Sequence, residues 1–402
     1  KSLNVTLRKS FGLFANIRPV KSYPHLIPGP EMNLVIVREN EEDTYAGIEH
    51  RQTAEVTQCL KLITRPGTDK ILHYAFALTT QSNRKKLTLM CKDNIMKLTD
   101  GVFSRRFTEI GTEFLQVDKE SMIIDIGAAK LAKDPGRFDV IVAPNLYGDI
   151  LSDIAAEISG SVGLCGSANL GSSFAMFEAV HGSAPDIAGS GIANPSGLLH
   201  AAIMMLHYHG QSATAHKIES AWNKALEDGF RTADIYNGEQ DQKKVTTKEF
   251  AQAVIERLDN CEIKNYDSVI LPDVSKSIEY AAEHPAGKEI TQKELTGVDI
   301  FLDWSIGNRD PEILGNALTK ASPDEWNLKM ITNRGVKVYP NGIPDTFCTD
   351  HWRCRFILKN TANPATIPHL MIALQNAGFE IIKTENLYSF DGEAGYSMGQ
   401  GE

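Results

Sequence analysis

The sequence is poor in cysteine and has no motif that would use cysteine to bind a metal. No Cys-x-x-Cys pair occurs in the 402 residues, and no group of Cys and His has the spacing of a zinc site. The six cysteines are scattered, at Cys59, Cys91, Cys165, Cys261, Cys348 and Cys354. We therefore expect a protein of a reducing compartment, with neither a disulfide framework nor structural zinc.

Long apolar runs and an excess of positive charge are also missing. The densest apolar run, residues 198–206, is far shorter than a membrane span. Asp and Glu number 51 against 41 Lys and Arg, which gives a formal net charge of −10. Because acidic chains bind nucleic acid and anionic membranes poorly, we expect a soluble intracellular protein that binds neither.

A Gly-x-Gly-x-x-Gly turn after a strand is absent, which excludes the classical Rossmann dinucleotide fold. Up to residue 258 the sequence instead alternates apolar runs of strand length with amphipathic helical segments. We expect strands at 33–37, 87–91, 122–125 and 138–143, a Gly/Ser-rich loop at 159–173, and helices at 94–114, 148–158, 195–208, 216–228 and 248–258. This alternation is typical of a layered α/β architecture.

The character of the sequence changes after residue 258. Residues 259–295 are charged and lack a strong period, so we expect a linker. From 296 to 402 the pattern is close to βαββαβ with an extra strand, which predicts a separate C-terminal ferredoxin-like α+β domain. RNA-binding modules share this order, but no strand carries their aromatic signature, which argues against RNA binding.

Acidic residues with helical spacing suggest a metal site. Asp149 and Asp153 lie at i and i+4, so both carboxylates are expected on one helix face, one turn apart. A hard divalent cation such as Mg²⁺ or Mn²⁺ suits such a pair. The alternative is that acidic residues simply favour a helix N-terminus. Asp125 follows an apolar run and is either a third ligand or a turn residue.

Arginines in the first forty residues suggest an anionic substrate. Arg8, Arg18 and Arg38 would bind a polyanion if they converge, because a guanidinium group pairs with a carboxylate through two hydrogen bonds. Ser2 and Asn4 lie on the same segment as Arg8 and could add neutral hydrogen bonds. The alternative is that the three arginines are unrelated surface cations.

Two residues are candidates for proton transfer. Tyr45 lies in ENEEDTYAGIE, and Lys92 follows the strand LTLMC at the end where α/β proteins place ligands. A lysine near a metal and away from water can have its pKa lowered enough to transfer protons. The alternative for each is an ordinary surface residue.

The segment 178–189, EAVHGSAPDIAG, has the composition of a ligand-binding loop. Its small residues allow the backbone to approach a ligand, and His181 offers a flat polar face. Asp186 could accept hydrogen bonds from a ribose diol, and Asn194 can cap the helix expected at 195–208. Without these contacts the segment would be only a loop.

The order of these segments is specific to one family. SLNVTLR, LFANIRP, VRENEEDTYAGIE, KDNIMK, NLYGDILSDIAAE and FEAVHGSAPDIAG, followed by ANPSGLL, resemble the β-decarboxylating dehydrogenases, which act on isocitrate, isopropylmalate or homoisocitrate. The resemblance covers about residues 1–258. It implies the layered isocitrate/isopropylmalate dehydrogenase fold and a metal-dependent oxidative decarboxylation with hydride transfer to a nicotinamide coenzyme.

The resemblance also implies which residues bind the small molecules. The substrate-binding positions are matched by Ser2, Asn4, Arg8, Arg18, Arg38 and Asn94. The coenzyme-binding positions are matched by Glu178, His181, Gly182, Ser183, Ala184, Asp186, Ile187 and Asn194.

Metal-binding and catalytic roles follow from the same resemblance. Asp149 and Asp153 match ligands of Mg²⁺ or Mn²⁺ from one subunit, and Asp125 matches the ligand lent by the dimer partner. Lys92 matches the catalytic lysine that reaches into the neighbouring subunit's site, and Tyr45 matches the tyrosine that protonates the carbanion. The expected assembly is a homodimer with shared active sites.

Two short pieces imply the substrate and the coenzyme. Ser-Leu-Asn at 2–4 is similar to isocitrate dehydrogenases, in which the serine contacts the distal carboxylate. Asp186 followed by Ile187 resembles the NAD pattern, whereas NADP enzymes typically have Lys-Tyr there. This implies an NAD-dependent isocitrate dehydrogenase forming 2-oxoglutarate and CO₂. The alternatives are a homoisocitrate or 3-isopropylmalate dehydrogenase, or a non-catalytic regulatory subunit that binds isocitrate or nucleotide.

The resemblance also implies the domain organisation. Residues 1–18 and 160–258 match the large coenzyme domain, and 19–159 match the small domain with the dimer clasp and the metal-site helix. The family's opening strand and GDGIGPE are absent, so we expect part of the coenzyme domain to lie outside this chain. The C-terminal segment resembles the extra domain of a subgroup from some bacteria and algal mitochondria, which suggests a bacterial cytoplasm or mitochondrial matrix.

Overall fold

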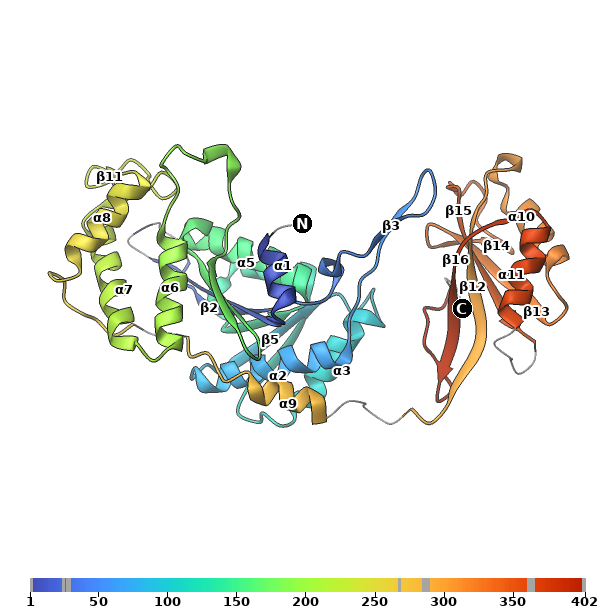
Figure 1. Ribbon diagram of the computed structural model, residues 1–402, viewed down its shortest axis with the longest axis horizontal. Helices are drawn as coiled ribbons and strands as arrows, with labels where there is room; N and C mark the ends of the chain where they lie inside the picture. Colours follow the sequence, from blue (N-terminus) through green and yellow to red (C-terminus); the bar gives the residue numbers. More distant parts are fainter. Residues whose placement is uncertain are drawn as a thin grey trace. The chain divides into compact units, whose positions relative to one another are not determined.

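The chain forms two compact units, seen in a computed structural model that describes residues 3–23, 26, 30–266, 269–283, 290–359 and 366–399. Unit 1 comprises Lys1–Ala46 and Lys61–Pro285, and unit 2 comprises Gly47–Leu60 and Ala286–Glu402 (Figure 1). The expected division of residues 1–258 into a large and a small domain stays a prediction, since both ranges belong mainly to unit 1.

Unit 1 is built on a mixed sheet with the strand order β6-β5-β7-β2-β1-β8-β9. These strands are β1 (Ala15–Lys21), β2 (Asn33–Glu39), β5 (Lys86–Cys91), β6 (Asp118–Ile123), β7 (Val140–Ala143), β8 (Gly166–Leu170) and β9 (Ala175–Ala179). β6, β5, β7 and β2 run parallel, and β1, β8 and β9 continue the sheet antiparallel. β2 and β7 lie at its centre, and parallel strands covered on both faces are apolar, as LVIV of β2 and VIVA of β7 are.

Helices cover both faces of this sheet (Figure 1). The helices of unit 1 are α1 (Leu3–Ser10), α2 (Arg65–Gln81), α3 (Thr99–Gly111), α4 (Ile124–Lys133), α5 (Asn145–Ser159), α6 (Ser196–Tyr208), α7 (Ser212–Glu227), α8 (Thr247–Arg257) and α9 (Ser275–Glu283). On β2, Val35 and Val37 join the core that contains α2 and α3, whereas Leu34 and Ile36 join the core that contains α4 and α5. Alternate residues thus face opposite layers, and the expected layered α/β fold is confirmed.

Unit 2 has the ferredoxin-like order expected for the C-terminal domain. Its sheet runs β14-β13-β15-β12-β16-β17, with antiparallel pairing throughout. Its elements are β12 (Lys293–Asp303), α10 (Pro311–Ala321), β13 (Trp326–Asn333), β14 (Val336–Tyr339), β15 (His351–Leu358), α11 (Thr366–Asn376), β16 (Glu380–Phe390) and β17 (Glu393–Ala394). The hairpin of β3 (Glu49–Arg51) and β4 (Thr57–Cys59) also belongs to unit 2, where Arg309 Nη2 lies 2.7 Å from Glu55 Oε1.

The expectation of a Gly/Ser-rich loop at 159–173 is wrong. This stretch contains the strand β8, with the sequence GSANL, and all five residues of β8 are buried. A Cβ atom on Gly166 would lie 2.4 Å from the backbone nitrogen of Ala201 in α6, so the strand needs a residue without a side chain there. Small residues that allow this close approach lack the apolar pattern by which a strand is recognised.

Two expected boundaries around the metal-site candidates also differ. The strand expected at 122–125 runs from Asp118 to Ile123, and Asp125 lies in the first turn of α4. β6 is an edge strand with a largely solvent-accessible sequence, DKESMI, which lacks the apolar run of a central strand. The helix expected at 94–114 starts only at Thr99, after turns at Lys92–Met96.

The linker expected at 259–295 contains α9, which belongs to the core of unit 1. Val274 and Ile278 pack in the cluster that includes α2, and the Tyr280 hydroxyl donates a hydrogen bond to Glu113 at 2.8 Å. The helix has only nine residues and charged residues surround it. It is therefore too short to show a clear helical period of apolar residues in the sequence.

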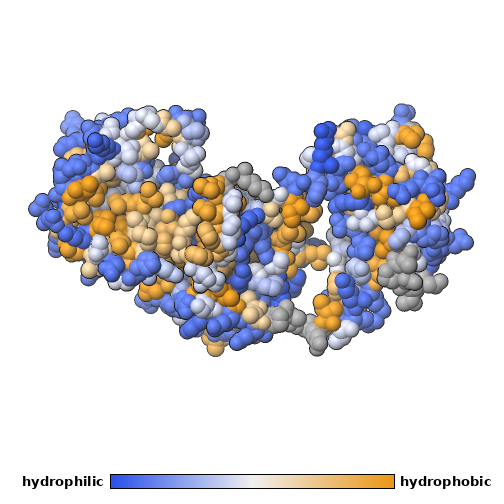
Figure 2. Space-filling view, in the orientation of Figure 1, coloured by the Kyte–Doolittle hydropathy of each residue, from blue (hydrophilic) through white to orange (hydrophobic). Residues whose placement is uncertain are grey.

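The densest apolar run of the sequence forms most of α6. Ala201 and Ile203 are buried, but Leu198, Met205 and Tyr208 are exposed, and apolar colour covers this part of unit 1 in Figure 2. Within the described residues, no helix combines the length and the apolar character needed to cross a bilayer.

The buried end of β2 makes folding sensitive to pH. Glu39 is 2% exposed and accepts a backbone N–H from Glu41 at 2.6 Å, yet burial raises its pKa to about 7. In the unfolded state the pKa of Glu39 is 4.5. Between pH 4.5 and pH 7 the folded state therefore binds more protons than the unfolded state, so the free energy of unfolding falls as the pH rises. Between pH 5 and pH 8, we expect wild type to lose about 2 kcal/mol of unfolding free energy relative to Glu39→Gln. Urea unfolding measures this, and parallel pH profiles would contradict it.

Candidate functional site

Two arginines from neighbouring strands meet the first turns of α5. β1 and β2 pair antiparallel with Asn16 opposite Arg38, so Arg18, two residues on, points to the same face of the sheet. Arg18 Nη1 lies 3.1 Å from Asp149 Oδ1, and Arg38 Nη1 donates to the same oxygen. The arginines are 2% and 1% exposed. Because a buried charge requires a partner, Asp149 is the carboxylate that these two enclosed cations share.

Neutral side chains hold both guanidinium groups in place. Arg38 donates to Asn145 Oδ1 from Nε at 3.0 Å and from Nη2 at 2.8 Å. Arg18 donates from Nε to Asn16 at 2.7 Å and from Nη1 to Ser152 at 2.5 Å. Asn145, Asn16 and Ser152 were not predicted as site residues. The spacing of Asn145 and Asp149 on one helix face is the signal that would have indicated the first of them.

The carboxylate pair on α5 fits a divalent cation. Burial acts to raise the pKa of Asp149, but Arg38, Arg18 and the Tyr45 hydroxyl outweigh it and the pKa is lowered. The pKa of Asp153 is raised by partial burial and by the charge of Asp149. Within the described residues Asp153 makes no hydrogen bond or ion pair, so its oxygens are available to a cation that would relieve the repulsion.

Tyr45 closes the same cluster from the other side. Its hydroxyl donates to Asp149 Oδ2 at 2.5 Å, and the Arg38 guanidinium lies 4.9 Å from its ring centroid. Burial and the Asp149 carboxylate raise the pKa of Tyr45, so the hydroxyl keeps its proton at neutral pH.

Arg8, on α1, pairs with a residue that was predicted to bind the coenzyme. Arg8 Nε lies 3.0 Å from Glu178 Oε1, and Asn4 Nδ2 lies 2.5 Å from Glu178 Oε2. Asn169 Nδ2 also donates to Glu178, at 2.8 Å. Glu178 therefore neutralises Arg8 here. Ser2 lies outside the described residues.

The three arginines share one electrostatic neighbourhood. Burial lowers the pKa of Arg18 and lowers that of Arg38 to about 10, and the positive charge of Arg8 contributes to both shifts. Asn16 Nδ2 donates to Asn169 Oδ1, which joins the Arg18 cluster to Glu178 through buried amides. The structure thus places the predicted arginines in one charged, hydrogen-bonded network.

Lys92 and Asp125 form a separate pair. Lys92 Nζ lies 2.7 Å from Asp125 Oδ1, and the Asp125 side chain is 68% exposed. Asn94 is exposed. No hydrogen bond or ion pair among the described residues joins this pair to Asp149. Within one chain, the predicted catalytic lysine and third metal ligand are therefore not part of the arginine cluster.

The predicted coenzyme loop lies mostly at the surface. Gly182, Ser183 and Asp186 are exposed, and His181 and Ile187 are partly exposed. Ala184 has a left-handed backbone conformation, with φ 42°. Asn194 is instead buried: its Oδ1 accepts the N–H of Ser196 at 3.0 Å, and its Nδ2 donates to Asp234 at 2.9 Å. Asn194 thus anchors the loop to α6, and Asp234 is a partner that was not predicted.

Known proteins match the chain over its whole length. Residues 1–254 match the family model "Isocitrate/isopropylmalate dehydrogenase", and 293–402 match "Bacterial isocitrate dehydrogenase, C-terminal domain". The Rickettsia bellii protein "Isocitrate dehydrogenase [NADP]" is 50% identical over 100% of this chain and 83% of its own length. The Thermus thermophilus protein of the same name is 40% identical over 100% of this chain and 80% of its own.

Solved structures agree with these matches. A crystal structure of a protein from Thermus thermophilus has a TM-score of 0.91 and 40% identity, covering 100% of this chain and 81% of that one. The isocitrate dehydrogenase of Methylococcus capsulatus has a TM-score of 0.61 and 42% identity, covering 64% and 76%.

These names overturn the expected coenzyme. Relatives from Rickettsia and Thermus that span the whole chain are named for NADP, so the expectation of an NAD-dependent enzyme with NAD as coenzyme is wrong. That expectation depended on Asp186 followed by Ile187, where NADP enzymes typically have Lys-Tyr. Asp186 is exposed and has no hydrogen bond or ion pair within the described residues, so nothing holds its carboxylate toward a ribose.

The close contact of α5 with Arg38 requires a glycine at position 148. A Cβ atom on Gly148 would lie 2.7 Å from Arg38 Cγ and 3.2 Å from its Cα, and Arg38 is fixed by Asn145. We expect Gly148→Ala to lower the unfolding free energy by about 1–3 kcal/mol, despite the better helix propensity of alanine. Gly101→Ala is the control, because its new methyl would meet only the end of the Arg105 side chain. Equal urea midpoints for the two variants would contradict the prediction.

Proposed function

The chain belongs to the isocitrate/isopropylmalate dehydrogenase family, and we propose that it oxidatively decarboxylates isocitrate to 2-oxoglutarate and CO₂ with NADP as hydride acceptor. The observation that carries the proposal is the convergence of Arg18, Arg38 and Tyr45 on Asp149. The names of the relatives that span the whole chain support the choice of isocitrate and NADP.

The arginines suit a tricarboxylate substrate. Arg8, Arg18 and Arg38 supply three guanidinium groups, which at present pair with the chain's own Asp149 and Glu178. Carboxylates of a bound substrate would exchange with these partners, because a guanidinium group binds either in the same geometry. Asn4, beside Arg8, would add a neutral hydrogen bond.

Asp149 and Asp153 would hold a Mg²⁺ or Mn²⁺ ion, with Asp125 of a second subunit as a further ligand. Such an ion, when bound, polarises the substrate hydroxyl and stabilises the enolate that remains after CO₂ leaves. Occupation of Asp149 by the cation would leave the guanidinium groups of Arg18 and Arg38 to the substrate carboxylates.

Tyr45 and Lys92 would move the protons. The Tyr45 hydroxyl keeps its proton at neutral pH and can donate it to the carbanion of the product. Lys92, paired with Asp125, would accept or return the hydroxyl proton in the site of a partner subunit.

A homodimer with shared sites accounts for the separation of these groups. Lys92 and Asp125 form no contact with the Asp149 cluster of their own chain, and Asp125 is exposed. On α4 and α5, Ile126 and Ile150 are 49% and 51% exposed, which suits a surface that packs against a second copy.

Turnover by the full-length protein tests the activity. With Mg²⁺ or Mn²⁺, we expect kcat/KM to be highest for isocitrate with NADP, above that with NAD, homoisocitrate or 3-isopropylmalate. Asp149→Asn should lower kcat by at least about 100-fold and keep NADP binding, because the cation acts in the transition state. Preference for another acid would change the substrate assignment, and a folded, inactive wild type would favour a regulatory subunit.

Complementation tests the shared site. Lys92→Ala and Asp149→Asn homodimers should each be inactive. A subunit-exchanged mixture should recover about a quarter of wild-type activity, because half of the dimers are mixed and each mixed dimer has one intact site. Mixing Lys92→Ala with Lys92→Ala,Asp149→Asn is the control, since no intact site can form. Absence of recovery after verified exchange would show that each site is built by one chain.

A further inference from the structure

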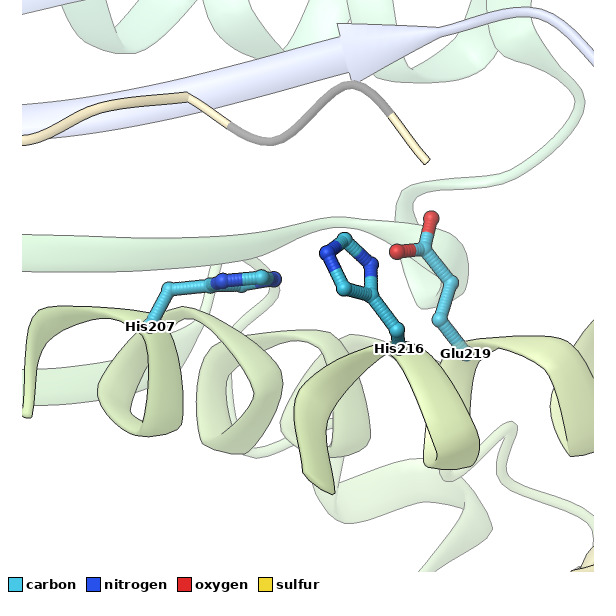
Figure 3. A group of neighbouring side chains, drawn as sticks. All are labelled: His207, His216 and Glu219. Carbon is cyan, nitrogen blue, oxygen red and sulfur yellow. The ribbon is translucent and has the colours of Figure 1, made fainter. Parts of the chain in front are cut away.

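Three potential metal ligands gather where α6 ends and α7 begins. His207 is in the last turn of α6, and His216 and Glu219 lie at i and i+3 on α7. Figure 3 shows the two imidazole rings and the carboxylate in a row on the same side of both helices. One ligand atom of each lies within 4.8 Å of the other two, and the ring centroids of the histidines are 5.0 Å apart.

The chemistry of this trio differs from that of the Asp149 pair. Two imidazole nitrogens and a carboxylate are the donor set of Zn²⁺ and similar transition metals, whereas carboxylates alone suit Mg²⁺. The Nε2 atom of His207 is buried and has no hydrogen bond within the described residues. Its Nδ1 lies 3.2 Å from the Ser212 hydroxyl, and metal-bound histidines use their second nitrogen in this way.

Glu219 already has one cation beside it. Lys21 Nζ lies 2.7 Å from Glu219 Oε1, which accounts for the charge of this buried carboxylate. A carboxylate has two oxygens and several lone pairs, so the second oxygen can bind a metal while the first keeps Lys21. Among the described residues, His216 Nδ1 accepts one hydrogen bond, a long one of 3.4 Å from the Tyr266 backbone N–H.

A cavity of about 100 Å³ adjoins the trio. His207 and Glu219 line it, together with Lys21, Tyr23 and His200. A tetrahedral ion held by three protein ligands keeps its fourth position for water or a small ligand, and this cavity has room for one.

We propose that His207, His216 and Glu219 form a second metal site, for Zn²⁺ or a related transition metal, separate from the site at Asp149. The ion would join the end of α6 to the first turns of α7. Since α6 directly follows the predicted coenzyme loop, the site would brace the helix from which that loop extends.

Co²⁺ is the probe for this site, because four-coordinate Co²⁺ with nitrogen ligands absorbs visible light strongly and six-coordinate Co²⁺ with oxygen ligands absorbs weakly. Chelator-treated full-length protein titrated with Co²⁺ should show a single strongly absorbing ion. Asp149→Asn should keep this absorption. His207→Gln and His216→Gln should each weaken binding at least about tenfold, since even outer-shell partners of metal ligands contribute about 10–100-fold.

His209→Gln is the matched control, because His209 is exposed two residues beyond His207 and should not contribute. Zn²⁺ should raise the unfolding temperature of wild type and of this control, and not that of His207→Gln or His216→Gln. Weak Co²⁺ absorption alone, or equal Co²⁺ binding by His207→Gln, His216→Gln and the control, would overturn the proposal. The trio would then be a histidine pair packed beside the Lys21–Glu219 ion pair.

Discussion

Burial of two guanidinium groups against one carboxylate is the constraint on which the candidate site depends. Arg18 and Arg38 lie inside the core, and Asp149 is the carboxylate that pairs with both of them. This requirement sets the position of α5 over β1 and β2, and it explains the glycine at 148 and the amide at Asn145. The residues that would perform the chemistry are therefore also the residues that hold this part of the fold together.

The carboxylates beside the arginines occupy positions that an anionic ligand could take. Asp149 and Glu178 occupy the positions of opposite charge around the arginines, and each is only partly buried. A polyanionic ligand would meet guanidinium groups that are already oriented by Asn16, Asn145 and neighbouring hydroxyls. Such preorganisation reduces the reorganisation required on binding.

The antiparallel insertion of β1 between β2 and β8 connects distant segments of the chain. Asn16 on β1 reaches Asn169 on β8, which reaches Glu178 on β9, so a buried amide chain links the arginine cluster to the start of the predicted coenzyme loop. Arg18 and Arg38, candidates for substrate binding, and Glu178, a candidate for coenzyme binding, thus lie on strands of one sheet.

Local patterns predicted much of this molecule. The central strands were visible because burial on both faces requires continuous apolar runs, and Asp149 and Asp153 were visible because helical spacing alone puts them on one face. The motif order identified the family. The same reasoning failed for β8, whose small residues allow its contact with α6. It also failed for the coenzyme, which was inferred from only two residues, Asp186 and Ile187.

Contacts between remote residues depended on the tertiary structure. The pairing of Arg8 with Glu178, the packing of α9 on α2, and the meeting of His207 with His216 and Glu219 have no signal in spacing. The histidines do not match a zinc motif, because a turn between two helices brings them together. Sequence patterns report the environment of each residue along its own helix or strand, whereas these partners are chosen by how helices and strands pack.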